Sequence, residues 1–453
     1  MKKIVLSLAS VLAATAFAPE AAAVASFARQ TGMACSACHQ QHFPVLNSFG
    51  RAFKAGGYTM MGAQGKVEGD HLSIPDTLNL SMLLKLRYQD QGGSPTTAQN
   101  LGDGLGVTSS NGQWQFGDEL VMFGGGRVAE NVGFFTEITL AKNPTSANAA
   151  IFRMPFAFDV GSVKLSIVPF TGDASGVTTG YDLGSTGTLR ANRWSEQRSD
   201  ISAFQYSLSS GAGGYAGAAT GFAFVAQNDM GYINYTRWSP NYMIGANSAA
   251  AGNSGATDMN SNLFRFAITP SYNDWAFHLG GGFMTGVSEL SGGGLTTVAN
   301  SAMYDARAHF FDGQAHGKLG GKDIGFYATY AKAPKVGGTC GTTTLTAGIQ
   351  KTSGCNLFNG NALDKWSWTL GADYSIIPHT LHIGAAYRDG RTGQETVAGN
   401  GQAKTAKSTM VQAIYDFTQN VALHAIYSSR SGSVYLPTSS GQNETLLMLE
   451  AAW

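Results

Sequence analysis

From about residue 77 onward, apolar and polar residues alternate along the chain with a period of two. The segment 78–89 shows this most clearly. Its apolar positions are Leu78, Leu80, Met82, Leu84, Leu86 and Tyr88, and the positions between them are Asn79, Ser81, Leu83, Lys85, Arg87 and Gln89. Successive side chains of a strand point to opposite faces, so the pattern predicts a strand with its apolar face outward and its polar face inward. Such a strand is long enough to cross a bilayer when tilted.

The alternation recurs at 134–140, 264–268, 304–310, 381–388 and 447–453. In the segment 304–310 we expect Ala306, Ala308 and Phe310 on the outward face, with Arg307 and His309 inward. In the last segment, Leu447, Leu449 and Trp453 share one face, and Glu450 lies on the other. A chain that ends on an outward aromatic residue resembles the C-terminal signature of bacterial outer-membrane barrels. The alternative is a soluble β-helix or sandwich that ends on tryptophan by chance.

Short turns and long loops alternate between the predicted strands, as they do in membrane barrels. Short turns are expected near 129–131, 159–161, 271–274, 377–379 and 418–420, and long loops near 91–112, 172–197, 239–260, 286–300, 333–362, 391–405 and 431–443. The pattern gives seventeen candidate strands, and single-chain bacterial barrels have even numbers. The conflict lies between 172 and 214, so we expect sixteen antiparallel strands, with eighteen as the alternative. The predicted fold is an all-β, porin-like transmembrane barrel formed by residues 77–453.

Composition supports a protein in contact with outer-membrane lipid. Charged residues make up 13% of the chain, against about 25% in soluble domains, and glycine accounts for 59 of 453 residues. After the N-terminal region no apolar run is long enough for a transmembrane helix. The net charge of zero argues against nucleic acid as a partner.

The chain begins like a secretory signal peptide, which we assign to residues 1–25. Lys2 and Lys3 precede an apolar stretch, and the small residues 23–25 offer a cleavage site. Cleavage would leave Ser26 as the first mature residue, or Val24 if the cut falls earlier. The protein is therefore expected to leave the cytoplasm.

The chemistry of the chain is concentrated in Cys35-Ser-Ala-Cys38-His39. Cys-x-x-Cys-His is the attachment motif of a c-type haem, in which both thiols bind the haem covalently and the histidine ligates its iron. A redox dithiol would be followed by a strand–helix pattern, and none follows. A zinc site needs further soft ligands nearby, and the next cysteine is Cys340. The sequence predicts one haem c, with Cys35 and Cys38 as attachment points and His39 as proximal ligand.

Residues 26–76 form the predicted haem c segment, mostly helix and loop. Leu46, Phe49 and Phe53 share helical spacing after Pro44, which suits the first turn of a helix. The candidates for the distal iron ligand are Met60 and Met61, because they follow the short helix at a workable distance and a thioether ligand would raise the reduction potential. The alternative role of this pair is packing. His71 or solvent is the alternative. His42 is too near His39 in sequence to reach the opposite side of the ring.

The apolar band of a barrel is about 25 Å tall. One haem on a periplasmic tether would therefore be too far from the outer surface for direct electron transfer. We therefore expect the haem segment to lie within or plug the barrel lumen. Lumen-facing side chains would hold the segment or balance the haem propionates, or simply line the pore. The candidates are Lys85, Arg87, Arg265, Arg307, His278, His309, His382 and His424. Cys340 and Cys355 lie in a long predicted surface loop, and we expect them to form a disulfide in an oxidising compartment.

The N-terminal motifs resemble those of a known family. The stretch from Phe27 to His39, Phe43-Pro44, Phe49-Gly50-Arg51 and Gly57-Tyr58 are similar to the fused monohaem cytochrome c–porins of the bacterial outer membrane. Within that family the chain most resembles the Fe(II)-oxidising outer-membrane cytochromes of iron-oxidising bacteria. The residue-level resemblance covers about 27–64, and the architecture covers the whole chain.

The resemblance implies an oxidoreductase that takes electrons from extracellular Fe(II) and passes them to a periplasmic c-type cytochrome. The same architecture also suits another donor or outward electron flow. A passive porin with a haem-bearing plug is the alternative from a different class.

Overall fold

The computed structural model describes residues 24–42, 44–91, 112–140, 148–172, 176–184, 219–240, 259–290, 302–335, 356–433 and 443–453. Most of the predicted signal peptide lies outside these residues, as do Cys340 and Cys355, so their predicted disulfide is not addressed by the structure. Within the described part of the chain, no helix is long and apolar enough to span a membrane.

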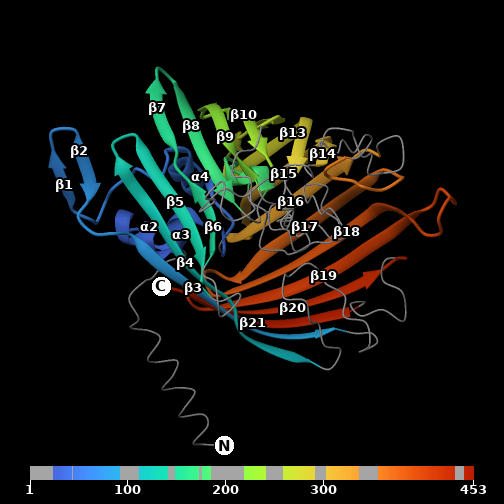
Figure 1. The fold of residues 1–453 in the computed structure, drawn as a ribbon. Coiled ribbons are helices and arrows are strands. Elements are labelled where there is room, and N and C mark those ends of the chain that lie inside the picture. Colours follow the sequence, from blue (N-terminus) through green and yellow to red (C-terminus); the bar gives the residue numbers. More distant parts are fainter. Residues whose placement is uncertain are drawn as a thin grey trace, which may run out of the picture.

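The chain folds as an antiparallel β-barrel that closes between its last strand and its first barrel strand (Figure 1). The N-terminal helices are α2 (Ala25–Thr31), α3 (Cys35–Cys38) and α4 (Ser48–Ala55), followed by a hairpin of β1 (Lys66–Gly69) and β2 (Leu72–Pro75). The first half of the barrel consists of β3 (Leu80–Gln91), β4 (Gln113–Ala129), β5 (Val132–Thr139), β6 (Asn148–Arg153), β7 (Phe156–Val160), β8 (Val163–Gly172), a 3₁₀ helix η1 (Gly176–Thr179), β9 (Ala219–Asn228) and β10 (Gly231–Ser239).

The second half consists of β11 (Ser261–Ile268), β12 (Ser271–Tyr272), β13 (Trp275–Leu290), β14 (Ala302–Asp305), β15 (Ala308–Leu319), β16 (Lys322–Ala333), β17 (Lys365–Ile377), β18 (Leu381–Glu395), β19 (Ala403–Thr418), β20 (Val421–Ser431) and β21 (Asn443–Ala452).

These segments make sixteen barrel strands, which confirms the predicted number. β6 and β7 both lie between β5 and β8, and the break between them contains Pro155, which has no N–H to donate. In the same way, β11 and β12 form one interrupted strand, and so do β14 and β15. The conflict in strand number lay between 172 and 214. β8 pairs directly with β9, so no further strand lies between these two.

Barrel closure depends on the C-terminal strand. β21 pairs with β3 from Glu444 opposite Gln91 to Ala452 opposite Leu83. The terminal residue continues this ladder, since Met82 and Trp453 exchange backbone hydrogen bonds of 2.7 and 3.0 Å. The Trp453 side chain is exposed on the outer face, as the C-terminal pattern predicts.

The alternation of side chains has the predicted orientation over most of the barrel. The outer face carries large apolar side chains on strands all around it, among them Phe224, Phe264, Phe283, Phe326, Leu370, Val411, Leu447 and Leu449. A closed antiparallel barrel with an apolar outer surface is the structure by which strands span a membrane, because every strand edge is paired. Of the predicted lumen side chains, Lys85, Arg87, Arg265, His278, His382 and His424 face inward.

For β15 the predicted orientation is wrong. Ala308 and Phe310 are buried inside the barrel, whereas Phe311 is 56% exposed on its outer face. Arg307 precedes the strand at a break in the pairing, and its side chain is 61% exposed beside Asp305. His309 is two residues before Phe311 on the strand, so it lies on the same outer face. Phe310 and Phe311 are adjacent and both apolar, so alternation alone could not assign the faces.

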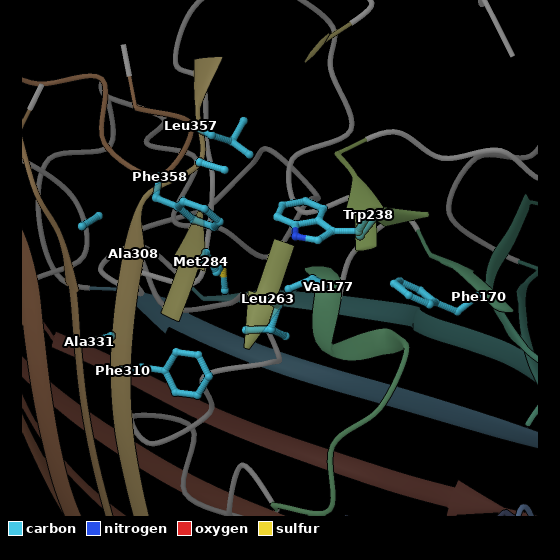
Figure 2. Packing of buried hydrophobic residues seen from close by; sticks show 13 residues of the cluster. Phe170, Val177, Trp238, Leu263, Met284, Ala308, Phe310, Ala331, Leu357 and Phe358 are labelled. Atoms are coloured by element: carbon cyan, nitrogen blue, oxygen red, sulfur yellow. The ribbon is translucent and has the colours of Figure 1, made fainter. Parts of the chain in front are cut away.

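Two groups of residues pack inside the lumen. An apolar cluster joins Trp238, Leu263, Met284 and Phe310 on the strands to Val177 of η1 and to Leu357 and Phe358 (Figure 2). The second group is the N-terminal segment, which packs Val45, Phe53 and Ala55 into three separate apolar clusters of the inner wall. Figure 1 shows α2, α3 and α4 near the end of the barrel where short turns join the strands, with the β1–β2 hairpin extending beyond that end. The prediction of mostly helix and loop did not include this hairpin.

Candidate haem-binding site

The Cys-x-x-Cys-His motif forms a single helical turn, α3, that ends at His39. Neither Cys35 nor Cys38 is joined in a disulfide, and both side chains are partly exposed. Residues three apart lie on the same face of a helix, so the two sulfur atoms are presented on one side. The Cys35 thiol lies 3.4 Å from the Gln419 carbonyl oxygen, and the Ser36 N–H donates to Gln419 Oε1 at 3.3 Å. Gln419 is in the β19–β20 turn, so the motif lies at the short-turn end.

His39 has the geometry of an iron-binding histidine. Its Nδ1 lies 3.3 Å from the Val45 carbonyl oxygen, which can only accept a hydrogen bond. This contact requires the tautomer with the proton on Nδ1 and the lone pair on Nε2, the nitrogen suited to bind a metal. Burial and the neighbouring His42 lower the pKa of His39 to about 4, although the Val45 hydrogen bond acts in the opposite direction. The imidazole is therefore neutral at neutral pH, as metal binding requires.

Asn47 holds the motif in place, and the sequence analysis missed this residue. Its side-chain oxygen accepts from the Gly50 N–H at 2.9 Å and caps α4, and its side-chain amide donates to Ala37 O at 3.0 Å. Its backbone N–H donates to Cys38 O at 3.0 Å. Asparagine before an amphipathic segment is a signal for a helix start. The helix therefore begins at Ser48, and Pro44 lies outside it.

Gly50 allows α4 to touch the backbone of the motif. A Cβ atom at this position would lie 2.1 Å from Cys38 O. The side chain of Phe53, one turn further along α4, is buried with Tyr58 and Phe135. The two thiols on one helical face, the oriented neutral histidine and this close glycine contact all fit a c-type haem attached at Cys35 and Cys38 and ligated by His39.

The candidate distal ligands lie in different environments. Met60 is partly buried and packs against the aromatic cluster of Phe53, Tyr58 and Phe135. Its carbonyl oxygen accepts from Gln30 Nε2 at 2.7 Å. Met61 is partly exposed, and His71 is exposed in the turn of the β1–β2 hairpin. Ligation by Met60 or Met61 stays a prediction.

His42 binds the barrel wall. Its Nδ1 lies 2.9 Å from Asp416 Oδ1, and its Nε2 lies 3.2 Å from Glu450 Oε1. Two further wall histidines contact the same carboxylates, His382 at 2.8 Å from Asp416 and His424 at 3.2 Å from Glu450. Burial lowers the pKa of His42, but the hydrogen bonds that its ring donates to Asp416 and Glu450, together with their negative charge, outweigh burial and raise the pKa to about 9. At neutral pH without bound metal, His42 is therefore an imidazolium between two carboxylates.

A second buried charge cluster lies elsewhere on the inner wall. Arg265 contacts Asp312 at 2.6 Å and Asp182 at 3.3 Å, and His278 lies 3.4 Å from Asp312. Tyr232 donates to Asp182 at 3.0 Å. His278, His382, His424 and Arg265 thus belong to networks of paired charges on the inner wall.

The closed antiparallel barrel, its apolar outer face and its short turns define a bacterial outer-membrane β-barrel of the porin type. In this barrel, a segment with a Cys-x-x-Cys-His motif packs against the inner wall.

No protein-family model matches the chain, and no curated protein matches it in sequence. Among solved structures, the chain is similar to the outer-membrane protein OmpT of Vibrio cholerae, with 11% identity and a TM-score of 0.42 over 86% of this chain and 100% of that one. A Salmonella typhi OmpF complex with daunomycin gives 12% identity and a TM-score of 0.44 over 86% and 100% of the two chains. The outer-membrane channel DcaP of Acinetobacter baumannii gives 10% and 0.45 over 83% and 97%. The barrel assignment rests on the strand pairing described above.

Replacing Gly50 with alanine is expected to separate α4 from the haem motif. The added Cβ would meet Cys38 O, and backbone must shift to relieve a contact this short, at a cost of about 1–3 kcal/mol. We expect haem content per barrel to fall severalfold, measured by haemochrome absorbance against protein. Gly56→Ala is the matched control, because its new Cβ would have its nearest neighbour at 3.4 Å. Equal haem content and thermal stability in both variants would contradict the close-contact role of Gly50.

The raised pKa of His42 predicts a loss of stability at high pH. The unfolded histidine titrates near 6.5, so the contribution is fully present below that pH and is lost as pH rises through about 9. At about 1.4 kcal/mol per pKa unit, the loss is roughly 3 kcal/mol. The measurement is urea unfolding in detergent and chelator between pH 6 and 10. The contribution of His42 is the difference in free energy of unfolding between the wild type and His42→Gln. A difference that stays constant over this range would refute the assignment.

Proposed function

We propose that the protein is an outer-membrane cytochrome–porin that oxidises extracellular Fe(II) and delivers the electrons to a periplasmic c-type cytochrome. The observation that supports this proposal most is the position of Cys35, Cys38 and His39 on a segment packed inside a membrane-spanning barrel. A passive pore does not require a haem-attachment motif, and a soluble electron carrier does not require a barrel.

The chain's own residues would hold one haem c in a fixed place. Cys35 and Cys38 would supply the thioether sulfurs, and His39 Nε2 would supply the proximal nitrogen. The bound group would supply one-electron exchange at its iron. Val45 fixes the orientation of the His39 ring through Nδ1, and burial keeps that ring neutral. Asn47 holds the motif next to α4 through its hydrogen bonds, and Gly50 allows the close contact between α4 and Cys38 O.

The position of the site suits electron delivery to the periplasm. In bacterial barrels the short turns face the periplasm and the longer loops face outward. The Cys35 sulfur contacts Gln419 in one of these short turns, and both thiols are partly exposed. A soluble acceptor would therefore meet the site from the periplasmic end. The apolar band is about 25 Å tall, so we expect the Fe(II) donor to enter the barrel from the opposite side.

Two alternatives share the same architecture. The motif specifies a haem and not its donor, so another donor or outward electron flow uses the same site; Fe(II) is favoured by the family resemblance alone. A passive porin is less consistent with the packing of the lumen. Val45, Phe53 and Ala55 of the N-terminal segment, together with the cluster of Figure 2, occupy space that a wide water-filled pore would need.

Anaerobic addition of Fe(II) to the purified protein is expected to reduce its haem promptly, seen as sharpening of the visible absorption bands. His39→Ala removes the proximal ligand and should abolish the fast phase, compared per haem bound. His379→Ala, in the exposed β17–β18 turn, is the matched control and should behave as wild type.

A haem that stays oxidised under conditions where reduction by Fe(II) is downhill would rule out iron oxidation. Reduction by a different donor in the same assay would then favour the general conduit. Rapid solute flux through liposomes containing the protein, without any haem reduction, would favour the passive porin.

A further inference from the structure

A group of histidines and carboxylates lies between the N-terminal segment and the barrel wall, apart from Cys35, Cys38 and His39. It comprises His42 of the segment, His382 of β18, Asp416 of β19, His424 of β20 and Glu450 of β21. All five side chains are at least nine-tenths buried. One residue of the segment and four neighbouring strands therefore converge on one point.

The spacing of three of these groups suits a metal ion. His42 Nε2 and His424 Nε2 each lie 3.2 Å from the same oxygen, Glu450 Oε1. One ligand atom from each of the three residues lies within 4.8 Å of the others. A first-row divalent ion binds nitrogen and oxygen at about 2.1 Å, which separates its ligand atoms by about 3.0–3.4 Å. Small side-chain movements would bring the three atoms onto a common ion.

The surrounding contacts already have the form of an outer coordination shell. His42 Nδ1, the nitrogen that would face away from the ion, lies 2.9 Å from Asp416 Oδ1. The other Asp416 oxygen lies 2.8 Å from His382 Nε2. A carboxylate that holds the far nitrogen of a histidine fixes the ring and raises its basicity, which is the usual arrangement behind metal-binding histidines.

The charge balance also suits a divalent cation. Glu450 and Glu119 share one lysine, Lys85, at 3.5 and 2.6 Å, and Asp416 adds a third carboxylate. A histidine binds a metal ion in its neutral form, so with the ion in place the three carboxylates and one lysine leave two negative charges around the site. A dication cancels that charge, taking the place of the proton that His42 carries in the metal-free protein.

We propose that His42, His424 and Glu450 form a site for a divalent first-row metal ion, oriented by Asp416 and His382. Two imidazoles and one carboxylate with open positions are the ligand set that suits non-haem Fe(II). The inference goes beyond the proposed function, since it requires neither haem nor electron transfer. An ion held there would tie the N-terminal segment to β20 and β21.

The test uses the mature full-length protein without a histidine tag, stripped with chelator and titrated anaerobically with Co(II) alone. Co(II) is a Fe(II) analogue that elemental analysis distinguishes from haem iron. We expect one Co(II) per chain in equilibrium dialysis. His424→Ala and Glu450→Gln should each weaken binding at least 100-fold, and His382→Ala about 10-fold, since it touches only the orienting carboxylate. His379→Ala should bind as wild type does.

Retention of wild-type affinity in both His424→Ala and Glu450→Gln would overturn the proposal. If either variant fails to fold, X-ray absorption at the cobalt edge of the wild type decides. Two imidazole ligands in that spectrum support the site, and a shell of water and carboxylate without imidazole overturns it. Absence of tight Co(II) binding in folded wild type also overturns it. Because Cys35→Ala, Cys38→Ala lacks the thiols for haem attachment, Co(II) binding by that double variant separates this proposal from the haem-based function.

Discussion

The lumen of this barrel buries carboxylates on its wall, and the N-terminal segment carries the histidine that meets them. Asp416 and Glu450 lie on strands far from His42 in sequence, yet both accept hydrogen bonds from its ring. Removing His42 would leave each of two buried carboxylates with one hydrogen-bond partner fewer. The resulting loss of folding free energy is larger than the contribution of an exposed ion pair. His42 is three residues beyond His39, so the contact that secures the segment also sets the position of the haem motif.

This constraint explains why a small segment can be ordered inside a large barrel. The described N-terminal residues are too few to form an independent core, and each of their apolar anchors is completed by the wall. Val45 packs with Met410 and Leu446, and Ala55 packs with Val168 and Val225. The barrel therefore serves as the core of the N-terminal segment, and the segment in turn occupies the lumen. Under the proposed function, haem chemistry and membrane crossing are parts of one folded unit.

Sequence alone predicted the features that depend on local pattern. Two-residue alternation predicted the barrel with seventeen candidate strands, and the even strand number of bacterial barrels reduced them to sixteen. The spacing of Cys35, Cys38 and His39 predicted the candidate haem site. Alternation failed at Phe310 and Phe311, where two adjacent aromatic residues make both phases equally apolar. The contacts of His42 could not be predicted from the sequence, because its partners Asp416 and Glu450 lie on distant strands that only the folded barrel brings to it. Asn47 was accessible as a helix-start signal and was overlooked in favour of Pro44.

The central claim is that Cys35 and Cys38 carry one covalent haem inside the barrel, and peptide mass spectrometry of the protein purified from outer membranes tests it most directly. The account predicts that the proteolytic peptide containing Cys35 to His39 carries the mass of one haem. It also predicts that the Cys35→Ala, Cys38→Ala double variant inserts as a barrel without haem. An unmodified peptide, or one in which Cys35 and Cys38 are joined to each other, would contradict the account.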